Sequence, residues 1–275
     1  MSKMISYEKK NTPIHALCGV TKLIFFILWC LASALTFDTR ILFVMLVLGA
    51  VIYVISGTKW KQIGGVFCAI MFFMTVNLLG IFFFAPYQGC EIYGSRSDIT
   101  HLFGDYFLTK EQLFYELNVF IKYFTVIPSV FIFLVTTDPS ELASSMNAIG
   151  IPYKVAYSVE IALRYIPDIQ DEFHKIKNAQ EARGIEMSSK GRLLYRIKNT
   201  AMIIFPLLFS SMERIDVVSN AMELRGFGKK KRRSWYSRRP FKTSDRVTLA
   251  FIIIFFVSAM IITYHDGNRF YNPFN

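Results

Sequence analysis

Apolar residues are gathered into five blocks along the chain, and charged stretches separate the blocks. The blocks cover residues 23–37, 41–56, 63–87, 119–135 and 247–264. A helix that crosses a bilayer perpendicularly needs about 20 mainly apolar residues. The first two blocks are short, so we expect flanking residues, local bilayer thinning or a tight hairpin to accommodate them. The pattern predicts an all-α membrane protein with about five spans.

The segment between the fourth and fifth blocks, residues 138–246, has a helical pattern without strand-like alternation up to residue 230. Asp138 is placed to cap a helix, with Pro139 at its first position and Glu141 at the reciprocal position of a capping box. Gly150 is placed to end this helix. The apolar run 201–209 is too short to be a span. We therefore expect a helical extension outside the bilayer.

Two prolines divide this extension further. Pro167 is expected to kink or break a helix, because proline lacks an N–H and crowds the preceding turn. Asp168, Asp171 and Glu172 then suit the N-terminus of a new helix that ends at Gly184. Two more helices fit residues 190–205 and 206–225, the second starting at a proline. The expected organisation is thus membrane helices and an outer loop (86–118) in 1–137, coupling helices in 138–246, and a last span with an outer tail in 247–275.

A seven-residue segment occurs twice in the extension. Asn178-Ala179-Gln180-Glu181-Ala182-Arg183-Gly184 matches Asn220-Ala221-Met222-Glu223-Leu224-Arg225-Gly226 at five of seven positions. Each copy falls at the expected C-terminus of a helix, where an Arg followed by Gly is ordinary capping. Capping does not require the shared Asn, Ala and Glu, so the repeat indicates a function at both helix ends.

Both arginines continue an apolar stripe rather than the polar face of their helix. The stripes, spaced by three and four residues, contain Ile169, Phe173, Ile176, Gln180 and Arg183, and Leu208, Met212, Ile215, Val218, Met222 and Arg225. A narrow helix end with an apolar flank and a guanidinium tip is suited to entering a groove and pairing with a carboxylate. Two such ends predict a partner with two equivalent grooves.

Basic residues are distributed unequally among the loops. Residues 138–246 hold 20 Lys and Arg against 12 Asp and Glu, whereas the loop 86–118 holds two against five. Because basic loops stay in the cytoplasm, we expect the N-terminus and 138–246 inside, and the loop 86–118 and the C-terminus outside. Topology accounts for most of the net charge of +11. An N-terminal pattern with Ala32-Ser33-Ala34 resembles a signal peptide, but we expect an uncleaved first span.

Motifs for catalysis and metal binding are absent from the sequence. It contains no Gly-x-x-x-x-Gly-Lys-Ser/Thr loop, so ATP hydrolysis is not expected of this chain. The four His and four Cys residues are scattered, and we expect no metal site and no cofactor. Lys122 is the clear ionisable residue inside a block, near its outer edge, where snorkelling explains it. The chain is predicted to be non-catalytic.

Several motifs resemble those of one transporter family, the transmembrane T components of energy-coupling factor (ECF) transporters, which include the cobalt- and nickel-transport membrane subunits. The resemblance covers most of the chain and is most specific over 137–228. It runs through His15, Leu17, Thr21-Lys22-Leu23, Thr137-Asp138-Pro139, Ile149-Gly150-Ile151-Pro152, Arg164-Tyr165-Ile166-Pro167, Ala179-Gln180-Glu181-Ala182-Arg183-Gly184 and Leu224-Arg225-Gly226-Phe227-Gly228. Leu224 stands where the family usually has Ala, and Gly19 where it often has Pro.

The resemblance implies a scaffold in the prokaryotic plasma membrane, placed between a pair of ATPases and a membrane-embedded substrate-binding S component. Two Ala-Arg-Gly motifs, here Ala182-Arg183-Gly184 and Leu224-Arg225-Gly226, would insert into two ATP-binding cassette ATPases. The helical extension would pass their movement to a membrane-embedded substrate-binding S component that releases a vitamin or metal ion inside. The apolar faces of residues 139–176 and 193–222 are the expected S-component contact.

Two other classes of protein fit part of the pattern. A permease of a conventional ABC importer also carries cytoplasmic coupling helices, but normally one per subunit. A membrane-anchored protein binding nucleic acid or anionic lipid would use residues 229–233 with Arg238 and Arg239. Trp235 and Tyr236 beside this run favour interfacial anchoring to anionic lipid, and no nucleic-acid partner is expected.

Overall fold

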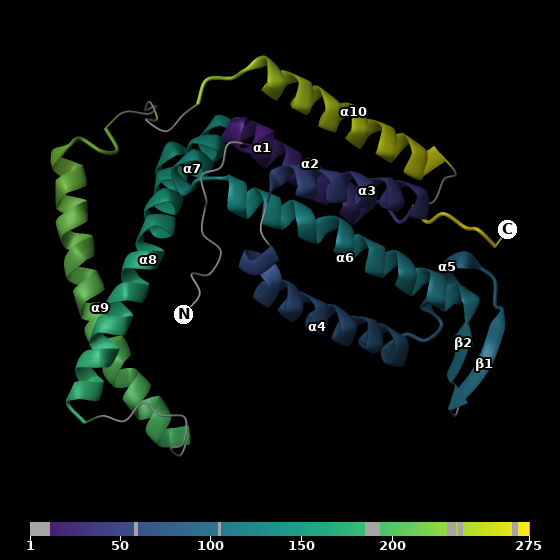
Figure 1. Cartoon of the computed structure of the whole chain (residues 1–275), viewed down its shortest axis with the longest axis horizontal. Coiled ribbons are helices and arrows are strands. Elements are labelled where there is room, and N and C mark those ends of the chain that lie inside the picture. The colour runs from purple at the N-terminus through teal and green to yellow at the C-terminus, as the bar shows by residue number, and fades with distance from the viewer. Residues whose placement is uncertain are drawn as a thin grey trace. The chain divides into compact units, whose positions relative to one another are not determined.

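A computed structural model describes residues 12–57, 60–103, 106–184, 193–229, 235, 239–265 and 269–274 (Figure 1). The chain divides into two compact units. Unit 1 consists of Met1–Glu141 and Arg239–Asn275, and unit 2 consists of Leu142–Arg238. Each unit is described by itself.

The five apolar blocks of the sequence form five helices of unit 1. These are α2 (Gly19–Leu35), α3 (Thr39–Ser56), α4 (Trp60–Phe84), α6 (Lys110–Thr136) and α10 (Thr243–His265), with a short α1 (Pro13–Ala16) before them. By length and composition, α3, α4, α6 and α10 can each cross a membrane, and α2 is a shorter apolar helix of 17 residues. The prediction of an all-α polytopic protein with about five spans is confirmed.

Hydrogen bonds at both ends of the helices fix their directions. At one end, the Lys22 ammonium at the start of α2 donates to the Thr136 carbonyl at the end of α6 over 2.9 Å. At the other end, Thr36 after α2 shares a 2.7 Å hydrogen bond with Thr263 near the end of α10. Helices α2 and α10 therefore run parallel to each other and antiparallel to α6, and Figure 1 shows them side by side.

Trp29 lies at the centre of the packing of unit 1. Its side chain is 1% exposed and stacks between Phe25 and Phe255, which brings α10 onto α2. A buried indole N–H requires an acceptor, and the Trp29 Nε1 donates over 3.1 Å to the Thr125 carbonyl of α6. One side chain thus joins three membrane helices.

The loop between α4 and α6 is folded rather than irregular. It contains α5 (Gln88–Tyr93) and an antiparallel hairpin of β1 (Asp98–Phe103) and β2 (Tyr106–Thr109). The sequence analysis did not predict this hairpin, and α6 begins at Lys110, earlier than the apolar block at 119. The loop packs on the same end of unit 1 as the C-terminal tail, where Asn272 donates to the Tyr93 carbonyl over 3.0 Å. Burial raises the pKa of the Tyr93 phenol to about 12.

Lys122 of α6 lies near this same end and has defined partners. Its ammonium donates to the Ala34 carbonyl over 3.1 Å and stands 3.3 Å from the centre of the Phe37 ring. The expectation of a lysine near the outer edge of its span agrees with this placement. The carbonyl and the aromatic ring, which a single sequence does not reveal, hold the charge there.

In the part of the extension that the structure describes, three helices precede α10, fewer than predicted. These are α7 (Pro139–Ala148), which crosses from unit 1 into unit 2, α8 (Tyr153–Ala182) and α9 (Leu193–Leu224). The predicted helix boundaries at the prolines are wrong, because Pro167 lies inside α8 and Pro206 lies inside α9. A proline costs one N–H bond but does not end a helix that other contacts hold. The predicted Asp138 cap is confirmed, since its Oδ1 accepts from the Ser140 amide at 2.9 Å.

Candidate functional site

The first repeat ends α8 at an exposed tip. The helix stops at Ala182, and the Gly184 amide donates back to the Glu181 carbonyl over 3.0 Å. Gly184 has a φ of 84°, a left-handed conformation that glycine adopts without strain. Ala182, Arg183 and Gly184 are all exposed. The glycine therefore ends the helix directly after an arginine that is open to a partner.

The second repeat ends α9 with two backbone hydrogen bonds that close its last turn. The Gly226 amide donates to the Glu223 carbonyl at 2.8 Å and the Phe227 amide to the Met222 carbonyl at 2.9 Å, with a Gly226 φ of 65°. This pair of bonds defines a Schellman motif. Arg225 is exposed, and Leu224 is 89% exposed. The larger Leu224 thus stands open at the position where the first copy has Ala182.

The residues that support the two motifs are exposed as well. Asn178, Ala179, Glu181, Asn220, Ala221 and Glu223 all lie on the surface of unit 2. Glu181 pairs with Lys177 one turn earlier on α8, with 3.6 Å between the charged atoms. Residues that serve only to end a helix do not need this shared exposed pattern. Both copies are therefore available as contact surfaces.

The two helix ends lie at opposite ends of an antiparallel helix pair. Contacts between α8 and α9 run in opposite directions along the two chains: Gln180 to Met202, Glu172 to Ser210, Asp168 to Arg214, and Tyr157 to Phe227. Arg225 therefore lies beside the start of α8, near Tyr157, while Arg183 ends α8. At 1.5 Å per residue, the length of helix between these points is about 40 Å. Unit 2 presents two separate tips.

Arg214 connects the two helices between these tips. Its guanidinium lies 3.8 Å from Asp168 Oδ2 and 3.4 Å from Glu172 Oε2, and the Ser210 hydroxyl also donates to Glu172. Asp168 and Glu172 were expected at a helix N-terminus. In the continuous α8 they are mid-helix and face α9 instead. The Arg214 contacts join the middle of α8 to α9.

Two hollows lie on the surface between α8 and α9, next to the Arg214 contacts. A groove of about 930 Å³ runs between α8 and α9 from the Arg214 contacts to Arg225, and is lined by charged and aromatic side chains. An apolar crevice of about 370 Å³ lies on the seam as well, and Ile169, Ile215, Val218 and Met222 line it. Ile169 of the first predicted stripe thus meets Ile215, Val218 and Met222 of the second in this seam, whereas Leu208 and Met212 of the second stripe remain exposed.

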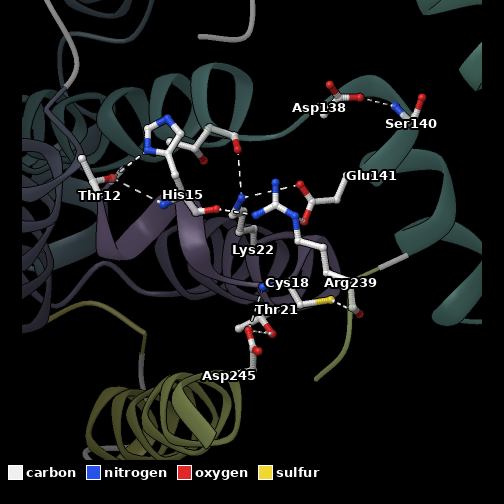
Figure 2. Close-up of polar contacts among 11 residues, drawn as sticks. Thr12, His15, Cys18, Thr21, Lys22, Asp138, Ser140, Glu141, Arg239 and Asp245 are labelled. Atoms are coloured by element: carbon white, nitrogen blue, oxygen red, sulfur yellow. Dashed lines mark hydrogen bonds and ion pairs between the residues drawn. The ribbon is translucent and has the colours of Figure 1, made fainter. Parts of the chain in front are cut away.

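A second candidate site is a buried ion cluster in unit 1 (Figure 2). Lys22 at the start of α2, Glu141 at the start of α7 and Asp245 at the start of α10 are 6%, 2% and 0% exposed. The Glu141 carboxylate lies 3.8 Å from the Lys22 ammonium and 3.5 Å from Arg239 Nε. Two acids and two bases from three distant parts of the sequence therefore meet in one place.

Backbone groups complete this cluster. Asp245 Oδ1 accepts from the Cys18 amide at 2.8 Å and from the Thr21 hydroxyl at 3.0 Å, and its Oδ2 accepts from the Lys242 amide at 2.8 Å. Arg239 donates to the His15 carbonyl over 2.7 Å. Figure 2 shows His15, Cys18, Thr21, Arg239 and Asp245 around the first turn of α2.

The Glu141 carboxyl is the acid most affected by this burial. Removal from water raises its pKa, while the positive charges of Lys22 and Arg239 and the Gly19 amide act against the increase. Glu141 was expected in a capping box; its carboxylate instead lies between two cations. In the sequence, His15, Thr21 and Lys22 stand out only as parts of the family resemblance, and Arg239 only as part of a basic run. The long sequence separations explain why the cluster was not predicted.

Among the residues that the structure describes, no group of three or more His, Cys, Asp or Glu side chains is placed to hold a metal ion. The four cysteines are free.

Together, the spans, the helical extension and its two exposed Arg-Gly tips describe a multi-pass membrane protein with two separate, exposed helix ends. A family model described as "Cobalt transport protein" matches residues 10–235. This chain belongs to that family, and it is a transmembrane component of the energy-coupling factor type.

Curated relatives share one description, "Energy-coupling factor transporter transmembrane protein EcfT". The protein of this description from Leuconostoc gelidum subsp. gasicomitatum is 29% identical over 210 residues, which cover 72% of this chain and 73% of that protein. The one from Streptococcus equi subsp. equi is 24% identical over 265 residues, covering 92% and 94%. The one from Lactobacillus helveticus is 33% identical over 155 residues, covering 54% and 56%. The similarity extends through both units.

Proposed function

We propose that this chain is the energy-coupling scaffold of an ECF-type importer for a vitamin or a transition-metal ion. Two ATP-binding cassette ATPases bind the ends of α8 and α9, and a membrane-embedded S component binds and carries the substrate. The scaffold itself catalyses no reaction and holds no cofactor. It passes the movement of the ATPases to the S component.

The observation that carries this proposal is the pair of exposed Arg-Gly tips at opposite ends of one antiparallel helix pair. Arg183 and Arg225 each follow a helix C-terminus that a positive-φ glycine ends, and both guanidinium groups are open to a partner. A separation of about 40 Å along the helix is too long for one small groove to receive both tips. Two ATPase subunits, each with one groove, match this arrangement.

The test is to replace both arginines. Arg183→Glu/Arg225→Glu reverses the charge that a groove carboxylate would bind, so we expect the ATPases to be lost when the complex is purified in detergent through this chain. Arg246→Glu is the matched control, because it makes the same change at an exposed position in the first turn of α10. Undiminished ATPase recovery with the double variant, at wild-type levels of the membrane chain, would contradict the proposal.

An exposed apolar stripe on α9 is the proposed S-component contact. Phe205, Leu208, Phe209, Met212 and Ile215 follow a spacing of three and four residues and are all exposed, with Met212 at 60%. A monomeric surface rarely leaves such a stripe uncovered. We expect Leu208→Asp/Met212→Asp to release the S component while the ATPases remain bound.

Val217→Asp is the control for this test. Val217 is 69% exposed on the same helix, but five residues beyond Met212 it points about 140° away from the stripe. We expect this variant to retain the S component. Equal retention by the stripe variant and the control would exclude the stripe as the contact.

A further inference from the structure

One ion pair joins the two residues of unit 1 that flank unit 2, a buried Glu141 and a partly exposed Arg239. The chain leaves unit 1 after Glu141 and returns to it at Arg239. The side chains of these two residues meet with 3.5 Å between Glu141 Oε1 and Arg239 Nε (Figure 2). The segment that carries Arg183 and Arg225 thus starts and finishes at the same point of unit 1.

The same carboxylate also contacts the first turn of a membrane helix. The Lys22 ammonium of α2 lies 3.8 Å from Glu141 Oε2 and donates to the Thr136 carbonyl that ends α6. Lys22 is 6% exposed, so water does not separate it from Glu141 as it would at the surface. Glu141 therefore connects the start of α7 to α2 and, through Lys22, to α6.

The last span is attached to the same turn of α2 from the other side. Asp245 in the first turn of α10 accepts from the Cys18 amide and the Thr21 hydroxyl, and Arg239 donates to the His15 carbonyl. These contacts join the returning chain to the residues around the start of α2. Three helices, α2, α7 and α10, consequently share one set of charged contacts.

A purely stabilising role does not require charged groups at this place. Removing one partner of a buried ion pair leaves an uncompensated charge and is strongly destabilising, whereas apolar residues in place of both partners commonly leave stability unchanged or higher. What the ions add is a defined geometry, since Glu141 must lie between Lys22 and Arg239 at once. This geometry fixes where α7 starts relative to α2 and α10.

We infer that Lys22, Glu141 and Arg239 are positioning residues through which movement of the coupling helices reaches the membrane helices. The inference rests on the proposed function, because it requires ATPases that move unit 2. A shift of α7 displaces the Glu141 carboxylate and with it the first turn of α2. Helix α2 then carries the shift into the bundle, where Trp29 packs it tightly against α6 and α10.

The experiment compares nucleotide-dependent hydrogen exchange in the intact complex. The wild-type complex, purified with its own ATPases, is measured with and without ATP plus vanadate, and we expect a change in amide exchange around residues 18–22 and 239–248. Lys22→Met/Glu141→Leu removes one acid and one base, so net charge is unchanged. We expect this variant to bind the ATPases and hydrolyse ATP. The difference in amide exchange between the complexes with and without ATP plus vanadate should fall about fivefold or more, which is an ordinary size for coupling between two sites.

Arg239→Lys is a second variant that decides the question if the double variant fails to assemble. It keeps the positive charge but cannot contact Glu141 and the His15 carbonyl as the forked guanidinium does, so we expect a smaller exchange difference in an assembled complex. Asp38→Asn is the control: Asp38 is 5% exposed and caps α3 at the other end of unit 1, and we expect a wild-type difference.

The inference would be overturned if the assembled variants showed the same nucleotide-dependent difference in amide exchange as wild type. It would also be overturned if ATP plus vanadate changed amide exchange in neither residues 18–22 nor residues 239–248 of the wild-type complex. These outcomes are distinct from failure of the proposed function, which appears as ATPases that remain bound to Arg183→Glu/Arg225→Glu.

Discussion

Glu141 is a residue of unit 1 that forms ion pairs with two different cations, Lys22 and Arg239. It is 2% exposed and lies within 4 Å of both Lys22 and Arg239. Charged side chains are almost never buried unless they are paired. The protonation of the Glu141 carboxyl therefore decides whether Lys22 and Arg239 have a negative charge beside them.

The raised pKa of Glu141 predicts a pH dependence of stability. Because the folded protein binds this proton more tightly than the unfolded chain, Glu141 contributes stability that is fully present below about pH 4.3, the ordinary value for Glu, and is lost as the pH rises through the raised folded pKa. Glu141→Gln removes this contribution. We expect the wild-type advantage in thermal unfolding midpoint over Glu141→Gln to be larger near pH 4 than near pH 8, as measured in detergent.

Glu91→Gln controls for the loss of one negative charge, since Glu91 is exposed on α5. A wild-type advantage over Glu141→Gln that grows as the pH rises would mean that attraction to Lys22 and Arg239 outweighs burial, contrary to the stated direction.

At the scale of elements, Gly89 explains how α5 lies against the start of α6. A Cβ at this position would lie 2.4 Å from the Glu111 carbonyl oxygen, which is backbone and cannot turn aside. The Gly89 amide also donates to the Gln112 side chain over 2.9 Å. We expect Gly89→Ala to destabilise the protein by about 1–3 kcal/mol through displacement of α5. Gly80→Ala meets no atom within 4 Å, and its midpoint in the same thermal unfolding assay should stay at or above that of wild type.

The end of α9 gives a second prediction at this scale. Gly226 has a φ of 65°, where a Cβ costs about 1–2 kcal/mol, so Gly226→Ala should unwind the last turn and misplace Arg225 without removing it. We expect weaker recovery of ATPase with the purified chain, measured as bound ATPase per membrane chain. Gly226→Asn, which tolerates this conformation better, should retain more. If both variants retain as much ATPase as wild type does, the Schellman motif at Gly226 is not what positions Arg225.

The helices also show which features could be predicted from the sequence and which could not. Spans, the Asp138 cap and the glycine-terminated ends of α8 and α9 follow from local patterns, so they were predictable. Pro167 and Pro206 were misinterpreted because tertiary contacts such as Arg214 with Glu172 keep a helix intact across a lost N–H bond. The ion cluster depends on residues more than 100 positions apart, such as Lys22 and Glu141, and no local pattern brings them together.

At the scale of the whole molecule, the ends of the membrane helices in unit 1 fall into two sets, one at each end of the bundle. Residues at one end, such as Lys22 and Thr136, belong to the side from which unit 2 continues, while Tyr93 and Asn272 meet at the other. The excess of Lys and Arg in 138–246 predicts that the first set is cytoplasmic. The two kinds of evidence, contact and charge, are independent and agree on which loops share a side.

Cysteine labelling in intact cells tests this orientation. In a background with Cys18, Cys30, Cys68 and Cys90 replaced by Ala or Ser, Glu91→Cys should react with a membrane-impermeant maleimide, because Glu91 is exposed in the loop expected outside. Lys229→Cys, exposed after α9, should react only after the membrane is permeabilised. The opposite labelling would place Arg183 and Arg225 on the side without ATP, where they could not bind ATPases. The orientation is therefore the condition on which the coupling role of both helix ends depends.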